Sequence, residues 1–191
     1  MLTRRFLFPA MHTQLVRGAL VALIAGFIVQ MTSQPAIAST ASSQVIATIV
    51  AKCLLSLPNS DVLLSLWGLP AKLTLLAPAL DHAVRKTAHF AEYAALGFVL
   101  VAWLRHTRRF ERHAYWMALT AGALFAGSDE WHQTFVPGRS GQLSDVLLDT
   151  TGCLFGILVY YCFKVFFVAI QKKRASAQKR KSSGISVQPV A

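Results

Sequence analysis

Charged residues are scarce in this sequence. Asp, Glu, Lys and Arg make up 14% of the 191 residues, hydrophobic residues make up 54%, and the mean hydropathy is +0.48. A water-soluble domain carries about 25% charged residues. The deficit indicates a protein that lies in lipid, and the length suits one compact membrane domain rather than several.

Cysteine pairs and known catalytic motifs are also missing. The three cysteines form no CxxC pair, and an odd number excludes a complete disulfide framework. Two of them, Cys153 and Cys162, lie in an apolar run, where a buried thiol packs as a small hydrophobe. No nucleophile elbow, phosphate-binding loop, dinucleotide fingerprint or HExxH motif occurs. We therefore expect no cofactor and no metal site.

Long apolar runs are present instead. A helix that crosses a bilayer core needs roughly 20 apolar residues. Four stretches predict such helices, at residues 18–35, 87–104, 114–128 and 146–170. The third is short, and we expect it to extend into the polar residues that follow. The predicted fold is an all-α membrane protein with a bundle of four transmembrane helices.

Acidic residues are nearly absent from one set of connecting segments. Residues 1–17, 105–113 and 171–191 hold 13 basic residues and one acid, a net charge of 13 − 1 = +12. The other connections and helix ends hold five basic and seven acidic residues, a net charge of 5 − 7 = −2. Because cytoplasmic segments carry excess Lys and Arg, this split predicts a multi-pass protein of the inner (plasma) membrane with both termini cytoplasmic.

The same charge distribution predicts three parts of the chain. Residues 1–16 form a cytoplasmic segment, residues 17–165 form the transmembrane domain, and residues 166–191 form a basic, disordered cytoplasmic tail near anionic lipid. We expect membrane lipids as partners and no nucleic acid. One alternative remains open, because "PAIAST" after the first apolar run resembles a signal-peptide cleavage site at Ala36–Ala38. Cleavage there would leave three spanning helices.

The segment between the first two predicted spans has an apolar helical face. Its members are Val45, Ile46, Ile49, Val50, Cys53, Leu54 and Leu57. This spacing predicts an amphipathic helix on the outer face of the membrane, or one that packs against the bundle.

Polar residues gather where the predicted spans reach the outer side. Residues three and four apart share a helix face, so Lys86, His89 and Tyr93 lie together, with Glu92 one turn from His89. Ionisable groups in a spanning helix usually face the protein interior or a water-filled cavity. We therefore predict that these residues belong to a polar site at the outer end of the bundle.

Residues 128–152 supply the rest of this site. Asp129 and Gln133 share a helix face with His132, Arg139 follows the turn at Pro137-Gly138, and Asp145 and Asp149 lie one turn apart. Further along, Gly152 and Gly156 form a small-xxx-small step that allows a close helix approach. The candidate ligand-binding residues are Lys86, His89, Glu92, Tyr93, Asp129, Glu130, His132, Gln133, Arg139, Asp145 and Asp149.

These segments resemble the VanZ-like family of integral membrane proteins, named for a protein linked to resistance against the glycopeptide teicoplanin. The resemblance lies in "KTAHFAEYAALG" (86–97), "SDEWHQTFVPGRSGQLSDVLLDTTG" (128–152) and "MTSQP" (31–35). It covers most of residues 17–165 and implies a membrane location and a link to envelope or glycopeptide response. It implies no defined reaction.

Several functions fit these residues. The charged side chains can pair with one another and only brace the bundle. A polar pocket can bind a lipid-linked glycan, a phosphate headgroup or a glycopeptide, with Lys86 and Arg139 holding an anion and Tyr93 or Trp131 stacking on a sugar ring. An outer-leaflet hydrolase or transferase would use His89, Glu92, Asp129 or His132 for acid–base catalysis. The same four side chains would suit zinc chemically, although no compact zinc motif is present. Transport by an oligomer is a further alternative.

Overall fold

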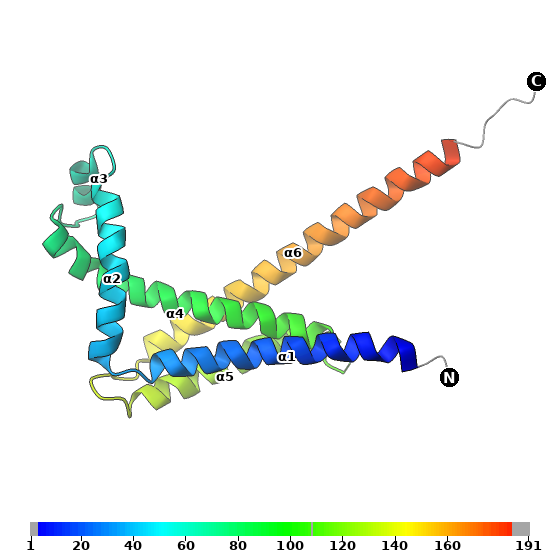
Figure 1. Ribbon diagram of the computed structural model, residues 1–191, viewed down its shortest axis with the longest axis horizontal. Coiled ribbons are helices and arrows are strands. Elements are labelled where there is room, and N and C mark those ends of the chain that lie inside the picture. The colour runs from blue at the N-terminus through cyan, green and yellow to red at the C-terminus, as the bar shows by residue number, and fades with distance from the viewer. Residues whose placement is uncertain (1–3, 108, 185–191) are drawn as a thin grey trace, which may run out of the picture.

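The computed structural model describes residues 4–107 and 109–184, and this part of the chain is helical without strands. The helices are α1 (Arg4–Thr32), α2 (Ala36–Leu55), α3 (Ser60–Leu66), α4 (Leu73–Arg105), the short 3-10 helix η1 (Glu111–His113), α5 (Ala114–Gln133) and α6 (Leu143–Gly184). Helices α1, α4, α5 and α6 form a bundle, and α2 runs across one end of it (Figure 1).

Four of these helices are long and apolar enough to cross a membrane. They are the segments Thr13–Thr32, Ala36–Leu55, Leu73–Arg105 and Leu143–Gln178, in α1, α2, α4 and α6. The chain is therefore an all-α, multi-pass membrane protein, as predicted. One of the four spans differs from the prediction. Helix α2 is long and apolar enough to cross a membrane, whereas α5, which contains the predicted third span, does not meet this criterion. Helix α5 extends to Gln133 through Asp129 and Glu130, whose charges lower its hydropathy, yet it packs within the bundle.

Two predicted boundaries were wrong. Helix α4 begins at Leu73 rather than at residue 87, with Pro78 inside it. A proline this close to a helix start removes one backbone hydrogen bond, and the helix continues. Helix α6 continues to Gly184, which corrects the expectation of a disordered tail from residue 166. Lys, Arg, Ala and Gln dominate this extension and are good helix formers.

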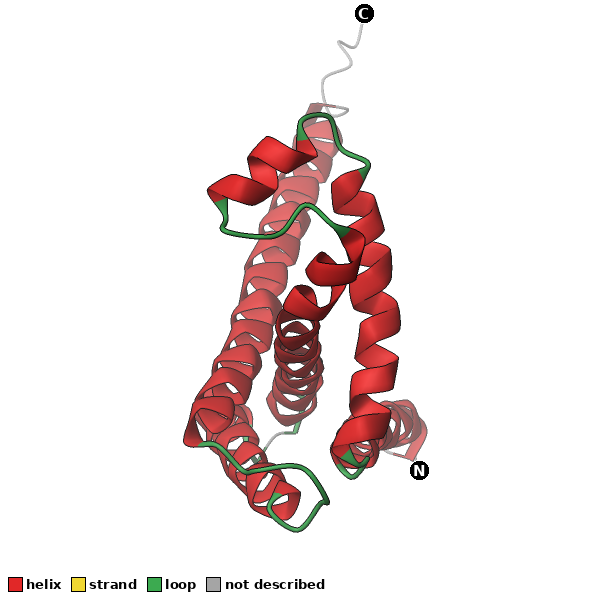
Figure 2. Ribbon diagram, turned by 90° about the vertical axis from the view of Figure 1, so that its left-hand side faces the viewer, coloured by secondary structure: helices red, strands yellow, loops and turns green. Residues whose placement is uncertain are grey.

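Helix α2 packs through small residues. Its buried side chains are Ser43, Ala47 and Ala51, and Ala51 contributes to a cluster with Leu76 of α4. The apolar face predicted for this segment is turned away from the bundle, since Val45 is 61% exposed and Ile49 is 56% exposed. Figure 2 views this end of the molecule, with α2 on one side and the connecting loops across the front. The exposed apolar face fits contact with lipid rather than with the bundle.

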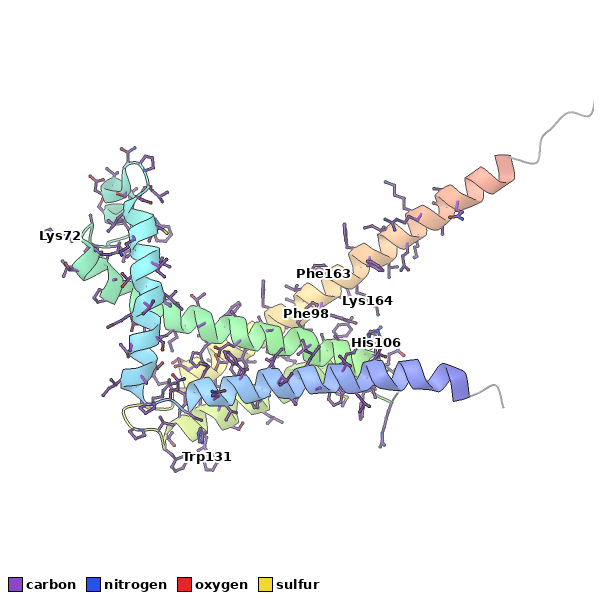
Figure 3. All side chains as sticks on the ribbon, viewed as in Figure 1. Lys72, Phe98, His106, Trp131, Phe163 and Lys164 are labelled. Carbon is purple, nitrogen blue, oxygen red and sulfur yellow. The ribbon has the colours of Figure 1, made fainter. Side chains whose placement is uncertain are left out.

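The segments that connect the bundle helices lie at two opposite ends of the bundle. The start of α1, the connection from α4 to α5 and the later half of α6 lie toward one end (Figure 1). The turn after α1 and the loop from residue 134 to 142 lie toward the other, here called the polar end. Figure 3 shows Trp131 at the polar end and His106 at the opposite end.

Glycines bring α4 and α6 into close contact. A Cβ atom added at Gly152 would collide with the backbone of Phe90, and one at Gly156 with the backbone of Ala94. The predicted close approach at this glycine pair is therefore confirmed, with α4 as the partner helix. The two helices run in the same direction, because both contacts advance by four residues together. Cys153, between the glycines, is fully buried, as expected for a small apolar side chain.

We expect Gly156→Ala to lower the thermal unfolding temperature in detergent. Overpacking a close contact costs about 1–3 kcal/mol, and here the new methyl group meets backbone that cannot rotate away. Gly127→Ala is the matched control, since an added Cβ at that helical position meets nothing within 4 Å. The control should melt at the same temperature as the wild type or higher, because Ala favours helix over Gly. Equal melting of the two variants would contradict a glycine-dependent α4–α6 contact.

Candidate functional site

A polar cavity of about 190 Å³ opens at the polar end of the bundle. Five of the predicted site residues line it, namely Lys86, His89, Gln133, Arg139 and Asp145. They come from α4, α5, α6 and the loop between the last two helices. The sequence prediction that separate helix ends bring polar side chains together is therefore correct for these five.

Ion pairs join α4 to α6 along one wall. Lys86 pairs with Asp145, and both side chains are partly exposed. One turn deeper, Nδ1 of His89 lies 3.8 Å from Oδ2 of Asp149, which is fully buried. Both pairs form because α4 and α6 run in the same direction. One turn along α4, from Lys86 to His89, therefore lies beside one turn along α6, from Asp145 to Asp149.

The loop after α5 is held over the cavity by hydrogen bonds. The backbone N–H of Gln142 donates to Oε2 of Glu130 at 2.9 Å, and Nε2 of Gln133 donates to Oε1 of the same carboxylate at 3.0 Å. Arg139 donates from Nη1 to the side-chain oxygen of Gln133 at 3.2 Å and from Nε to the backbone oxygen of Gln34 at 3.0 Å. The loop is thereby tied to both α5 and the end of α1.

Acidic and phenolic groups are buried below the cavity. Asp129 is 3% exposed and accepts a hydrogen bond of 2.7 Å from the hydroxyl of Thr32. Tyr93 and Asp149 are fully buried, and neither the phenol oxygen nor the two carboxylate oxygens have a hydrogen-bond partner among the described residues. Tyr93 is therefore not available to stack on a sugar ring in the cavity.

The walls of the cavity carry more positive than negative charge. Three cations, Arg85, Lys86 and Arg139, line it together with the single carboxylate of Asp145. Nη2 of Arg85 lies 3.4 Å from Asp81, and its Nε is buried without a hydrogen-bond partner in the described part of the chain. Burial lowers the pKa of Arg139 from its ordinary value, and the charge of nearby Arg85 lowers it further. An anion between these two guanidinium groups would relieve their repulsion.

Two predicted acid–base candidates lie outside this cavity. His132 is exposed, and its Nε2 lies 3.2 Å from the hydroxyl of Ser33 at the end of α1. Glu92 is half-buried on α4, one turn below His89, and does not line the cavity. Within the described part of the chain, no group of three or more His, Cys, Asp or Glu side chains is placed to hold a metal ion. His89 with Asp149 is the histidine–carboxylate pair that the cavity does offer.

Sequence reasoning missed several residues of the site. His82 and Arg85 line the cavity, and each lies four residues before a predicted site residue, Lys86 and His89 respectively. The i+4 spacing would have found them, but the apolar span was predicted to begin only at residue 87. Thr32 and Gln34 belong to the "MTSQP" segment, whose part in the site shows only when the end of α1 reaches α5 and the loop.

A comparison with protein families identifies the family of this chain. The family model described as VanZ/LLP1 matches residues 18–166, which is more than half of the chain and contains every residue of the site described above. Nothing matched among curated proteins or solved structures.

Proposed function

The chain belongs to the VanZ/LLP1 family, and we propose that its polar cavity binds the anionic group of a cell-envelope ligand. The ligand is a lipid-linked glycan or a lipid with a phosphate headgroup, because both carry an anionic phosphate beside polar groups. A glycopeptide is the third possible class of ligand. The proposed site holds the anion between Arg85, Lys86 and Arg139. Gln142, Ser140 and Asp145 supply polar groups to neighbouring hydroxyls.

The excess of positive charge in the cavity carries this proposal. Lys86 is already paired with Asp145, and Arg139 uses two donors to hold the loop. Arg85 adds a third positive charge to the cavity wall, and its ion pair of 3.4 Å is with Asp81, which does not line the cavity. Arginine also presents donors in a planar fork that fits phosphate.

We expect Arg85→Gln to weaken binding of a polyprenyl phosphate by about tenfold or more, since hydrogen bonds to charged groups contribute roughly 1.5–3 kcal/mol. Binding is measured by titration of the purified protein in detergent. Arg112→Gln is the matched control, because it removes the same charge from an exposed position at the opposite end. The control should bind like the wild type.

Two further measurements separate binding from bracing. Arg85→Gln leaves Asp81 without its cation, so the double variant Asp81→Asn/Arg85→Gln is tested as well. A binding site predicts weak binding with a near-normal unfolding temperature in the double variant. If binding stays normal while both variants melt early, the charges only brace the bundle. In cells, the double variant should change teicoplanin sensitivity and Arg112→Gln should not, which tests the proposed link to glycopeptide response.

We propose that the polar end faces outward from the inner (plasma) membrane and that both chain ends are cytoplasmic. The net charge of +12 on one set of segments against −2 on the other supports this orientation. A single cysteine placed at residue 107, in a chain whose three natural cysteines are replaced, should resist a membrane-impermeant thiol reagent in intact cells. A cysteine at residue 140 should react. The reverse pattern would refute the proposed orientation.

A second candidate function follows from the pair of His89 and Asp149. A histidine on the cavity wall with a buried carboxylate beside its Nδ1 is arranged as a general base oriented by an acid. Such a pair can activate water for hydrolysis of a bound phosphoester or diphosphate.

Hydrolysis predicts release of inorganic phosphate from a polyprenyl diphosphate by the purified protein. His89→Asn should slow that release by about 10²-fold or more, because a positioned acid–base group usually contributes this factor. The affinity for the ligand should change little. His132→Asn is the control and should keep full activity, because His132 lies outside the cavity. Absence of turnover in the wild type would exclude hydrolysis of this substrate and leave binding as the function.

A further inference from the structure

A groove runs between α5 and α6 toward the end of the bundle opposite the polar cavity. It consists of two adjoining cavities of about 370 and 510 Å³, which share Tyr115 and Tyr161. The first is lined by apolar side chains that include Trp116 and Leu154. The second adds the basic residues Arg105, Lys164 and Lys172. We call the two cavities together the α5–α6 groove.

Lys164 is the unusual residue of this groove. It interrupts an apolar stretch of α6 in which Phe163, Val165 and Phe166 are all more than half exposed. Its side chain is half-buried and forms no ion pair with any residue that the structure describes. A charged group in a membrane-spanning segment is costly unless it is paired or reaches the membrane surface. A negatively charged group at the same level of the membrane would therefore stabilise Lys164.

Arg105 is held in place at the same end. Its Nη1 donates to the backbone oxygen of Glu111 at 3.1 Å, and its guanidinium carbon lies 5.5 Å from the ring centre of Tyr115. Its Nε is buried without a hydrogen-bond partner among the described residues. Its Nη2 also forms an ion pair of 3.7 Å with Oε1 of Glu111, so the guanidinium is fixed beside the groove.

The helix geometry places both basic residues at similar depth. From the contact of Ala94 with Gly156, α4 needs 105 − 94 = 11 residues to reach Arg105, and α6 needs 164 − 156 = 8 residues to reach Lys164. At 1.5 Å per residue these are roughly 17 and 12 Å. Figure 3 shows Lys164 toward the same end as His106, which follows Arg105 in the chain. Both side chains can therefore reach one headgroup.

We propose that the α5–α6 groove binds one anionic phospholipid, with an acyl chain along Trp116, Leu154 and Leu158 and the phosphate against Arg105, Lys164 and Lys172. The dimensions agree with this ligand. From Leu154 to Lys164 the helix rises over 164 − 154 = 10 residues, or roughly 15 Å. This equals one leaflet, half of a hydrocarbon core of about 30 Å. Tyrosines lie at the junction, where membrane proteins concentrate them at the lipid–water boundary.

The test compares two lipids with identical acyl chains, phosphatidylglycerol and phosphatidylcholine. The full-length protein in detergent is titrated with each lipid, and retained lipid is counted by native mass spectrometry. The wild type should prefer phosphatidylglycerol by roughly tenfold, and Lys164→Gln/Lys172→Gln should lose most of this preference. Lys173→Gln/Arg174→Gln is the matched control, since it removes the same charge from neighbouring exposed residues that do not line the groove.

Trp116→Ala tests the apolar half of the groove. Trp116 is 73% exposed, so its loss should leave folding intact while both lipids bind more weakly. Equal retention of the two lipids by the wild type would overturn the proposal. An equal loss of preference in the control variant would do the same, because it would indicate general attraction to a basic helix. Binding of soluble glycerol phosphate as tight as that of the lipid would show that the groove recognises a free anion instead.

Discussion

The close contact between α4 and α6 is the constraint on which the polar site depends. In a bilayer, lipid tails are as apolar as the helices, so helices associate through tight packing rather than through the hydrophobic effect. Gly152 and Gly156 allow the backbone of α4 to lie directly against α6. That contact sets the relative position of the two helices and so places Lys86 beside Asp145 and His89 beside Asp149. A side chain at either glycine would separate the helices and weaken both ion pairs.

The polar site has a cationic mouth and an acidic floor. Buried carboxylates are costly unless hydrogen bonds or cations stabilise them. Asp129 accepts a hydrogen bond from Thr32, whereas Asp149 has no hydrogen-bond partner among the described residues and lies 3.8 Å from His89. Bracing and ligand binding are compatible in this arrangement. Arg139 and Glu130 hold the loop at the cavity, and Arg85 lines the same cavity.

The two ends of the bundle present basic side chains in different surroundings. At the polar end they share a cavity with polar loop residues, which suits a headgroup with hydroxyls around an anion. At the other end, Lys164 adjoins an apolar groove, which suits a headgroup attached to an acyl chain. Helix α2 adds an exposed apolar surface near the polar end, because its buried side chains are the small Ser43, Ala47 and Ala51. The two proposed ligands therefore differ in the surroundings of the basic side chains and not in the charge itself.

The sequence by itself determined the helical class, three of the four apolar spans and the residues that share each helix face, because hydrophobicity and the 3.6-residue repeat are local properties. It also indicated the glycine step at Gly152 and Gly156. Only the tertiary structure decided which faces meet. It placed Arg85 and His82 in the cavity, turned His132 toward Ser33 and buried Tyr93. The reason is that spacing along one helix determines only which residues are neighbours on that helix. Contacts between helices depend on how the helices are placed relative to one another. Here the backbone contact at Gly152 and Gly156 and the loop held by Glu130 set that placement.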